Sequence, residues 1–441
     1  MPRQNLLYEL NLHKYWQTNH ASETLWAIKL SMDTNQIVMA KDTTSAAAEE
    51  VNVVANDHLL SEILRRLPIR SLFRFKSVCR HWFSLIADDP QLGLRQNPDP
   101  SSVSGLFLYP SFIGFRFWNK HTEMDNPGLD FLPFYSEKVP PDPTFIPNLS
   151  GLIILSSCHG LLCCLGYNEI DQKGGYHIVN PTTKQFITLP DPHLDGFDGL
   201  NLAFDPSRSP FYKVVNIWHT DETLPTNPNV SVLKFQIEIY SSETRSWRSS
   251  GEPFFITADV HHLNFSGGIF WNGALHWFPD VGDGFYFHVE QERLGRVPEI
   301  TEREGMAWYD RSVMSPVVAH DHFHVIEIYG STGSQIDVYE MEKDYSGWFV
   351  KYKVDLDSVV AAFPQMGPIL SAGRQHEAYS VLSLVGDEND EEWFLVLHVP
   401  GKIIRYNLVD KSFGIIQDVG MNETSLRYFS AIHHIESYAN V

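Results

Sequence analysis

Residues 267–278 read Gly-Gly-Ile-Phe-Trp-Asn-Gly-Ala-Leu-His-Trp-Phe. Two apolar runs, Ile269–Trp271 and Ala274–Trp277, flank the dipeptide Asn272-Gly273. Asn-Gly between two such runs is the strongest local sign of a β-hairpin, because both turn residues must adopt positive φ. This stretch therefore predicts two antiparallel strands and suggests an all-β fold for the surrounding chain.

Similar short apolar runs extend in both directions from this hairpin. They contain four to seven residues rich in Val, Ile, Phe, Tyr and Trp, and they are bounded by Gly, Pro, Asn or Asp, which is typical of strands. The runs read GLFLYP, GLIILSS, GLLCCLG, YHIVN, YKVVNIW, FQIEIY, GGIFW, ALHWF, HVIEIYG, FLVLHV and KIIRYNL. We expect one large β domain over residues 105–437.

A weak repeat also recurs within this region. Residues 179–186 (VNPTTKQF), 240–247 (YSSETRSW) and 406–413 (YNLVDKSF) share a strand, a turn, a basic residue and an aromatic one, and residues 338–345 are a looser copy. Each copy could be a hairpin whose returning strand places its aromatic on the core side. Repeated hairpins of this kind suggest propeller blades, although the spacing does not decide whether the ring closes.

The segment before the β domain has a different pattern. Leucine and isoleucine residues from Leu59 to Leu67 fall on one face of a helix that Pro68 should end. Ser71 can cap a second amphipathic helix, whose apolar residues run from Phe75 to Ile86. We predict a helical module at residues 51–95, a linker at 96–104 and a disordered extension at 1–50.

Composition excludes several classes of function. The chain has 33 Lys and Arg against 54 Asp and Glu, a net charge of −21, which disfavours nucleic acid as a partner. No apolar run reaches 18 residues, and the N-terminus lacks a signal-peptide pattern, so we predict no membrane partner and a cytoplasmic or nuclear location. Residues 56–90 instead carry six basic and four acidic side chains, which suits an acidic protein partner.

The candidate chemical groups form no convincing catalytic or metal site. The four cysteines, Cys79, Cys158, Cys163 and Cys164, are read as reduced, buried thiols. His320, His322 and His324 alternate, so a strand would place them on one face as possible metal ligands, but a solvent-facing strand edge explains them equally well. Because no known catalytic motif appears, we predict a non-enzymatic protein with no metal and no cofactor.

Residues 55–92, ANDHLLSEILRRLPIRSLFRFKSVCRHWFSLIADDPQL, resemble the F-box. One departure is Ala55-Asn56, where the family usually has Leu-Pro. The remainder is similar to the F-box-associated domain of plant F-box proteins, in motifs such as CHGLLCCLG (158–166), IEIYSSETRSWR (237–248) and PGKIIRYNL (400–408). The resemblance implies an α+β multidomain chain, with a small three-helix F-box followed by a large all-β, propeller-like F-box-associated domain.

The same resemblance implies a substrate receptor of an SCF-type cullin–RING ubiquitin ligase, bound to a Skp-family adaptor and to an unknown protein target. Apolar residues crowd the F-box beyond what so small a unit can bury by itself, which favours a protein interface. The predicted adaptor-binding residues are Leu59, Leu60, Ile63, Leu64, Leu67, Pro68, Leu72, Val78, Cys79, Trp82, Leu85 and Ile86.

Target binding is expected on surface connections of the β domain. The longest irregular connections are predicted at 121–150, 219–231 and 280–316, and the aromatics expected to anchor a target are Phe285, Tyr286, Trp308 and Tyr309. Two alternatives stay open at this point. The chain could be a propeller-type enzyme or lectin with an incidental helical prefix, or a receptor that binds the adaptor but acts outside ubiquitin transfer.

Overall fold

The computed structural model describes residues 57–66, 80–87, 103–110, 129–134, 141, 145–168, 170, 173–193, 197–224, 227–257, 265–278, 284–300, 313–329, 334–366, 369–371, 374–376, 379–386, 393–419 and 429–441. The chain divides into two units, residues 1–96 and 97–441. The predicted N-terminal extension, residues 1–50, lies outside the described residues.

The first unit contains two described helices, α3 (Asp57–Arg66) and α5 (Arg80–Ala87). In α3 the apolar residues recur every three or four positions, so one stripe of the helix faces inward. Leu60 and Leu64 of that stripe are fully buried, as is Ile86 of α5. The described residues Asp57–Arg66 are helical, which confirms the helix predicted before Pro68.

The second unit is a β-propeller, and five of its blades are four-stranded antiparallel sheets within the described residues. Blade 1 comprises β3 (Leu149–Cys158), β4 (Leu161–Asn168), β5 (Lys173–Asn180) and β6 (Gln185–Thr188). Blade 2 comprises β7 (Phe197–Ala203), β8 (Lys213–Leu224), β9 (Asn227–Ser241) and β10 (Ser246–Thr257). Blade 3 comprises β11 (Ile269–Trp271), β12 (Ala274–Trp277), β13 (Phe285–His288) and β14 (Arg293–Arg296).

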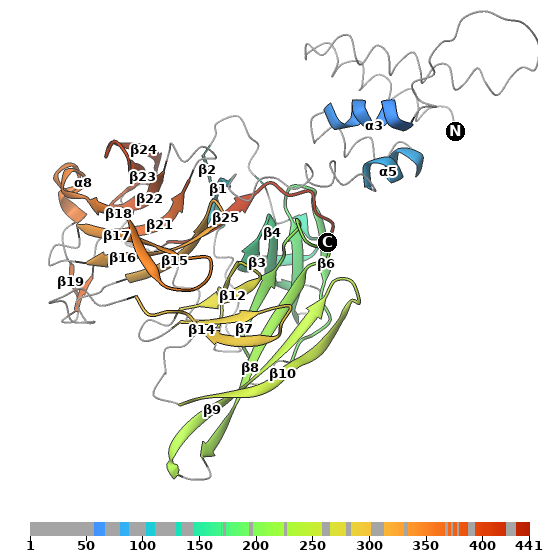
Figure 1. Cartoon of the computed structure of the whole chain (residues 1–441). Helices are drawn as coiled ribbons and strands as arrows, with labels where there is room; N and C mark the ends of the chain where they lie inside the picture. The colour runs from blue at the N-terminus through green and yellow to red at the C-terminus, as the bar shows by residue number, and fades with distance from the viewer. Residues whose placement is uncertain are drawn as a thin grey trace, which may run out of the picture. The chain divides into compact units, whose positions relative to one another are not determined.

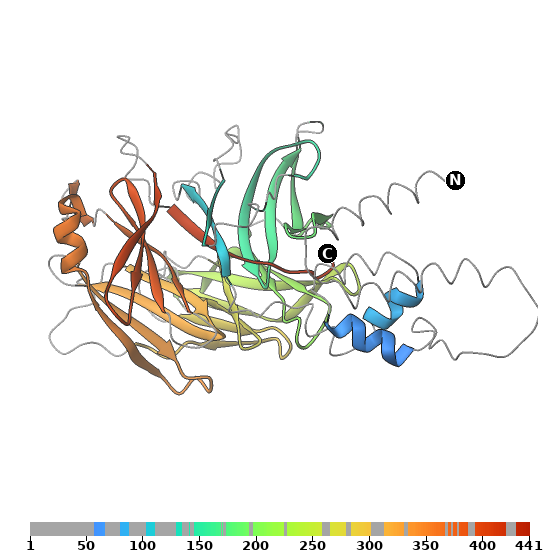
Figure 2. The same cartoon turned by 90° about the horizontal axis from the view of Figure 1, so that it is seen from above.

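Blade 4 comprises β15 (Val313–Ala319), β16 (His322–Tyr329), β17 (Gln335–Met341) and β18 (Trp348–Asp355). Blade 5 comprises β21 (Ser380–Val385), β22 (Phe394–Val399), β23 (Lys402–Asn407) and β24 (Phe413–Asp418). Between these two blades the chain forms α8 (Asp357–Ala362), the 3-10 helix η4 (Pro364–Met366) and a hairpin of β19 (Ile369–Ser371) and β20 (Arg374–His376). Helix α8 lies at the rim of the propeller in both views (Figures 1 and 2).

The sixth blade combines strands from the beginning and the end of the β domain, and this pairing closes the ring. Its strand β25 (Phe429–Ile435) pairs antiparallel with β1 (Val103–Pro110), which in turn pairs with β2 (Asp130–Pro133). The inner strands β3, β7, β11, β15, β21 and β25 follow one another around the ring, and β25 lies next to β3. The propeller is therefore six-bladed and closed, which settles the question that the repeat spacing left open.

The Asn-Gly hairpin forms as its sequence predicts. Asn272 and Gly273 have φ values of +50° and +77°, and Trp271 pairs with Ala274 across the turn. This is the backbone that a two-residue hairpin requires, and only Gly and Asn adopt it readily. The turn joins β11 to β12 and lies on the same side of the ring as the other turns between the first and second strands of a blade, because the strands alternate in direction.

The weak sequence repeat marks the turn between the third and fourth strands of a blade. The basic residue of each full copy, Lys184, Arg245 or Lys411, has a φ of +55°, +54° or +59° and lies one or two residues before the last strand of its blade. A single residue in this left-handed conformation after a type I turn is a common hairpin connection. The repeat therefore encodes one blade turn, in blades 1, 2 and 5.

The aromatic of the repeat behaves as expected in two copies out of three. Trp247 and Phe413 pack against hydrophobic cores between blades. Phe186 does not, because its side chain on the short outer strand β6 is 40% exposed. The prediction that every returning strand places its aromatic on the core side is therefore wrong for blade 1.

The hydrophobic core consists of layers between neighbouring blades. One layer joins blades 1 and 2 and contains Tyr212 and Tyr240, the next joins blades 2 and 3 around Phe265, and a third joins blades 4 and 5 around Trp393. Because strands buried on both faces leave no polar face, their sequences read as continuous apolar runs, as in β22 (FLVLHV).

Blade 2 extends further outward than its neighbours. Strands β8, β9 and β10 have 12, 15 and 12 residues, whereas no strand of blade 3 exceeds 4. The outer parts of these three strands form an arm that reaches beyond the other blades (Figure 1). Residues 219–231 were expected to be an irregular connection, and this is wrong, because residues 219–224 belong to β8 and residues 227–231 to β9, and the two strands are paired up to Leu224 and Asn227.

Candidate binding surfaces

Helices α3 and α5 hold most of the predicted adaptor-binding residues that the structure describes. Four of these residues are buried within the chain, namely Leu60, Leu64, Trp82 and Ile86. Ile63 and Leu85 are only half buried. Burial of the first four shows that they stabilise the helices in this conformation, so Ile63 and Leu85 are the two described candidates for direct contact with a partner.

The structure does not describe the side chains of the other predicted adaptor-binding residues. Five of them lie outside the described residues, namely Leu67, Pro68, Leu72, Val78 and Cys79, and the Ala55-Asn56 departure lies there too. Leu59 belongs to α3, but its side chain is not described. Their adaptor-binding role stays a prediction.

A polar contact fixes the two helices to each other at their exposed side. Nε2 of His81 on α5 lies 3.0 Å from Oδ1 of Asp57 at the start of α3, and both side chains are about half exposed. A carboxylate in the first turn also interacts favourably with the positive end of the helix dipole. Exposed ion pairs contribute at most about 1 kcal/mol, so the buried leucines remain the main source of stability in this unit.

The predicted target-binding aromatics are found in a strand. Phe285 and Tyr286 begin β13, and both side chains are half buried. The Tyr286 ring lies 4.7 Å from that of Tyr345 in blade 4, and the Arg296 guanidinium lies 5.7 Å from the Phe285 ring. The expectation that residues 280–316 form one irregular connection is wrong, because β13, β14 and the start of β15 lie within them.

Trp308 and Tyr309 lie outside the described residues. Within the predicted connection 121–150, the structure describes β2 and the start of β3 at Leu149. A target-binding role for the four aromatics remains a prediction, and for Phe285 and Tyr286 it would use the half-exposed part of each ring.

The sequence patterns did not identify several apolar side chains that are exposed in the structure. Phe255 on β10 is 56% exposed, and Ile415 on β24 is 57% exposed. Both lie on the outermost strand of a blade, where one strand edge has no neighbour in the same sheet. No sequence signal marks them, because an apolar run reads the same in an outer strand as in an inner one.

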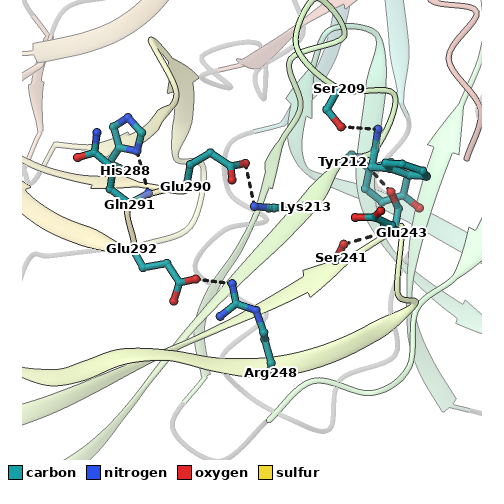
Figure 3. Close-up of polar contacts among 12 residues, drawn as sticks. Ser209, Tyr212, Lys213, Ser241, Glu243, Arg248, His288, Glu290, Gln291 and Glu292 are labelled. Atoms are coloured by element: carbon teal, nitrogen blue, oxygen red, sulfur yellow. Dashed lines mark hydrogen bonds and ion pairs between the residues drawn. The ribbon is translucent and has the colours of Figure 1, made fainter.

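Polar contacts connect blades 2 and 3 on the side of the ring that carries the turn between β13 and β14 (Figure 3). Lys213 Nζ at the start of β8 lies 2.8 Å from Glu290 Oε1 in that turn. The Arg248 guanidinium and the Ser250 hydroxyl, both on β10, donate to the two carboxylate oxygens of Glu292. The hydrogen bonds from Arg248 and Ser250, together with the positive charges nearby, lower the pKa of Glu292, so the carboxylate stays charged at neutral pH.

The alternating histidines occupy two different environments. His320 lies in the turn between β15 and β16 with a φ of +52°, whereas His322 and His324 point toward Glu340 on β17, at 2.5 and 3.2 Å. His324 is fully buried, so a solvent-facing strand edge does not describe it. In the described part of the chain, no three His, Cys, Asp or Glu side chains are arranged to hold a metal ion.

Glu340 is the centre of this cluster. Lys351 Nζ on β18 lies 2.7 Å from Glu340 Oε2 and 4.0 Å from the centre of the Trp393 ring in blade 5. Burial alone raises the pKa of Glu340, but the hydrogen bonds from His324 and Lys351 and the positive charges of Lys351 and His322 outweigh it and lower the pKa to about 2. The arrangement is a structural ion cluster between blades 4 and 5.

The described cysteines are buried thiols. Cys158, Cys163 and Cys164 are free, and none is exposed. Burial raises the pKa of the Cys158 thiol to about 12, so it is protonated at neutral pH and a poor nucleophile. This confirms the reading of these three as reduced thiols, while Cys79 lies outside the described residues.

Comparison with known proteins agrees with this geometry. The F-box domain family matches residues 56–92, and the family described as the F-box associated beta propeller domain matches residues 135–314. An F-box protein of Arabidopsis thaliana is 31% identical over 414 residues, which cover 90% of this chain and 94% of the relative. A second F-box protein of the same plant is 28% identical over 243 residues, covering 50% and 57%.

A third relative, an F-box/kelch-repeat protein of Arabidopsis thaliana, is 26% identical over 251 residues, covering 54% of this chain and 59% of the relative. Among the described helices of the chain, none is both long and apolar enough to cross a membrane.

Proposed function

Because the chain belongs to the F-box proteins that carry an F-box associated β-propeller domain, we propose that it is a substrate receptor of an SCF-type cullin–RING ubiquitin ligase. The F-box would bind a Skp-family adaptor, and the propeller would bind a protein target. The observation that carries this proposal is the combination, in one chain, of a helical F-box at 56–92 and a closed propeller.

In this role the chain itself performs no chemistry. A target held near the charged ubiquitin carrier presents its lysines at a high effective concentration, which accelerates transfer without a catalytic group on the receptor. Burial of the described thiols and of the Glu340 side chain, which is 8% exposed, is consistent with such a role. Boundaries at 51–95 for the F-box, 96–104 for the linker and 105–437 for the propeller form part of the proposal.

For the adaptor contact we assign Ile63 and Leu85 to the docking face. Their partial exposure leaves apolar area to be covered by a partner, whereas Leu60 and Leu64 have none left to cover. Burying a half-exposed isoleucine contributes roughly 1 kcal/mol, and a buried, unpaired carboxylate in its place costs more.

The test is co-purification with a Skp-family adaptor and a cullin. The full chain should bring down both at a constant ratio, and the Ile63→Asp variant should lose adaptor binding by at least about tenfold, which corresponds to 1.4 kcal/mol. Ser84→Asp, on the exposed side of α5, is the control and should bind as the unchanged chain does. A chain that purifies alone, like an enzyme or lectin with an incidental helical prefix, would refute the receptor role.

A further inference from the structure

The segment after the last strand crosses from blade 6 to blade 1. Strand β25 ends at Ile435, and the chain then runs to the end of β5, where Asn180 lies. The Asn180 side-chain amide Nδ2 donates to the main-chain oxygens of Ser437 and Ala439, at 3.1 and 2.8 Å. Asn180 is fully buried and Ser437 is 1% exposed, so water does not compete for the bond to Ser437, while the bond to Ala439 is partly buried.

Two further contacts hold the same segment. The main-chain N–H of Ser437 donates to the Thr182 hydroxyl at 3.2 Å, and the side chains of Ala439 and Val441 pack against the core layer between blades 1 and 2. The backbone approaches closely at Gly160, in the turn between β3 and β4. A Cβ at that position would lie 2.4 Å from both the Ile435 oxygen and the Ser437 Cβ.

Comparison of the blade 1 and blade 5 copies of the repeat distinguishes two roles of the Asn180 side chain. Its Oδ1 accepts from the main-chain N–H groups of Thr182 and Thr183, at 3.0 and 3.1 Å, which stabilises the turn after β5. Asn407 holds the equivalent turn of blade 5 in the same way, by accepting from the N–H groups of Val409 and Asp410. Because an acceptor oxygen suffices for this turn, Asp would serve equally well. Only the amide nitrogen of Asn180 requires asparagine, and it binds the segment at 437–441.

We propose that the surface around Asn180, Thr182 and Gly160 is a peptide-binding site, which residues 437–441 of the same chain occupy. The site recognises two main-chain carbonyls through one amide and places small apolar side chains over the core layer between blades 1 and 2. Its ligand class is therefore a short extended peptide with small residues at alternate positions, as in Ser437-Tyr-Ala-Asn-Val441. Occupation connects blade 6 to blade 1 and reinforces the closed ring.

The experiment uses the full chain and a variant that lacks residues 437–441. The deletion should lower the melting temperature, and a synthetic peptide of residues 436–441 should bind the deletion variant and restore part of the loss. The peptide should not bind the intact chain, because the site is filled. An unchanged melting temperature, or equal binding to both forms, would overturn the proposal.

Asn180→Asp provides the specific test, with Asn407→Asp as the matched control. In the deletion variant, Asn180→Asp should weaken peptide binding by at least roughly tenfold, because it replaces two donated hydrogen bonds with a carboxylate facing two carbonyls. If the deletion variant does not fold, hydrogen exchange on the intact chain decides. The amides of residues 437–441 should then exchange faster in Asn180→Asp than in Asn407→Asp, and equal protection in both would refute the site.

Discussion

His276 should make the stability of the propeller depend on pH. It lies in β12 with 1% of its surface exposed, its Nε2 is 2.9 Å from the Tyr345 hydroxyl, and its Nδ1 is 3.3 Å from the Ile269 oxygen. Burial lowers the pKa of His276 from 6.5 to about 4, although the nearby carbonyls of Ile269 and Ala274 favour the charged form.

The sign and the size of the pH effect on the free energy of unfolding follow from this pKa shift. Above pH 6.5 the imidazole is neutral in both the folded and the unfolded chain, so it contributes no pH dependence. As the pH falls below that value the unfolded chain binds a proton that the folded chain does not, and the free energy of unfolding decreases by about 1.4 kcal/mol per pH unit. The full loss, reached near the folded pKa, is roughly 3 kcal/mol.

The assay is denaturant unfolding of the intact chain, followed by tryptophan fluorescence, at about pH 7.5 and about pH 5. His276→Phe should be less stable at the higher pH, because it removes the hydrogen bond with the Tyr345 hydroxyl, but it should lose less stability on acidification by about 2 kcal/mol. His193→Phe is the control, since His193 is exposed. Equal acid sensitivity in the unchanged chain and His276→Phe would refute the assignment.

Three further outcomes follow from single contacts. Gly199→Ala should destabilise the propeller by several kcal/mol in thermal unfolding, because its Cβ would lie 2.2 Å from the Phe265 main-chain oxygen; a loss below about 1 kcal/mol would contradict this. Glu340→Gln should cost about 3 kcal/mol or more in denaturant titrations, whereas Lys343→Met, which breaks the exposed pair with Asp321, should cost less than about 1 kcal/mol; equal effects would show that burial is not decisive. Cys158 should react with an aromatic disulfide reagent only on unfolding, and fast labelling of the native chain would argue against its raised pKa.

The strands could be predicted from the sequence because their signals are local. The Asn272-Gly273 turn needs only two adjacent residues, and each blade turn of the repeat needs one residue in the left-handed conformation. The helical stripe of α3 was equally visible, but a stripe does not say which partner covers it. The sequence pattern of Leu60 and Leu64 is the same whether these side chains pack inside the chain or against another protein. The structure shows that they are buried within the chain.

The expectation that Phe285 and Tyr286 lie in an irregular connection was wrong for a related reason. Phe285 and Tyr286 stand beside Gly284 and follow a polar, glycine-containing stretch, so the sequence favours a loop there. In the structure they pair with Trp277 and His276 of β12 and so extend the sheet that the Asn-Gly hairpin starts. A strand of four residues is too short for a periodic pattern, and its identity comes from the neighbouring strand.

Closure of the ring is the step that local patterns cannot encode. Strands β1 and β25 each read as ordinary strands, yet they meet across 330 residues, as the hydrogen bond from the Ser104 hydroxyl to the His434 oxygen shows. The Ser157 hydroxyl of β3 donates to the His433 oxygen at 3.0 Å and joins β25 to the next blade. Such non-local pairing costs loop-closure entropy, and contacts beyond the strand ladder help to offset that cost. The carbonyl-binding amide of Asn180 adds such contacts one step further along the same chain, so deletion of residues 437–441 should weaken closure and lower the melting temperature.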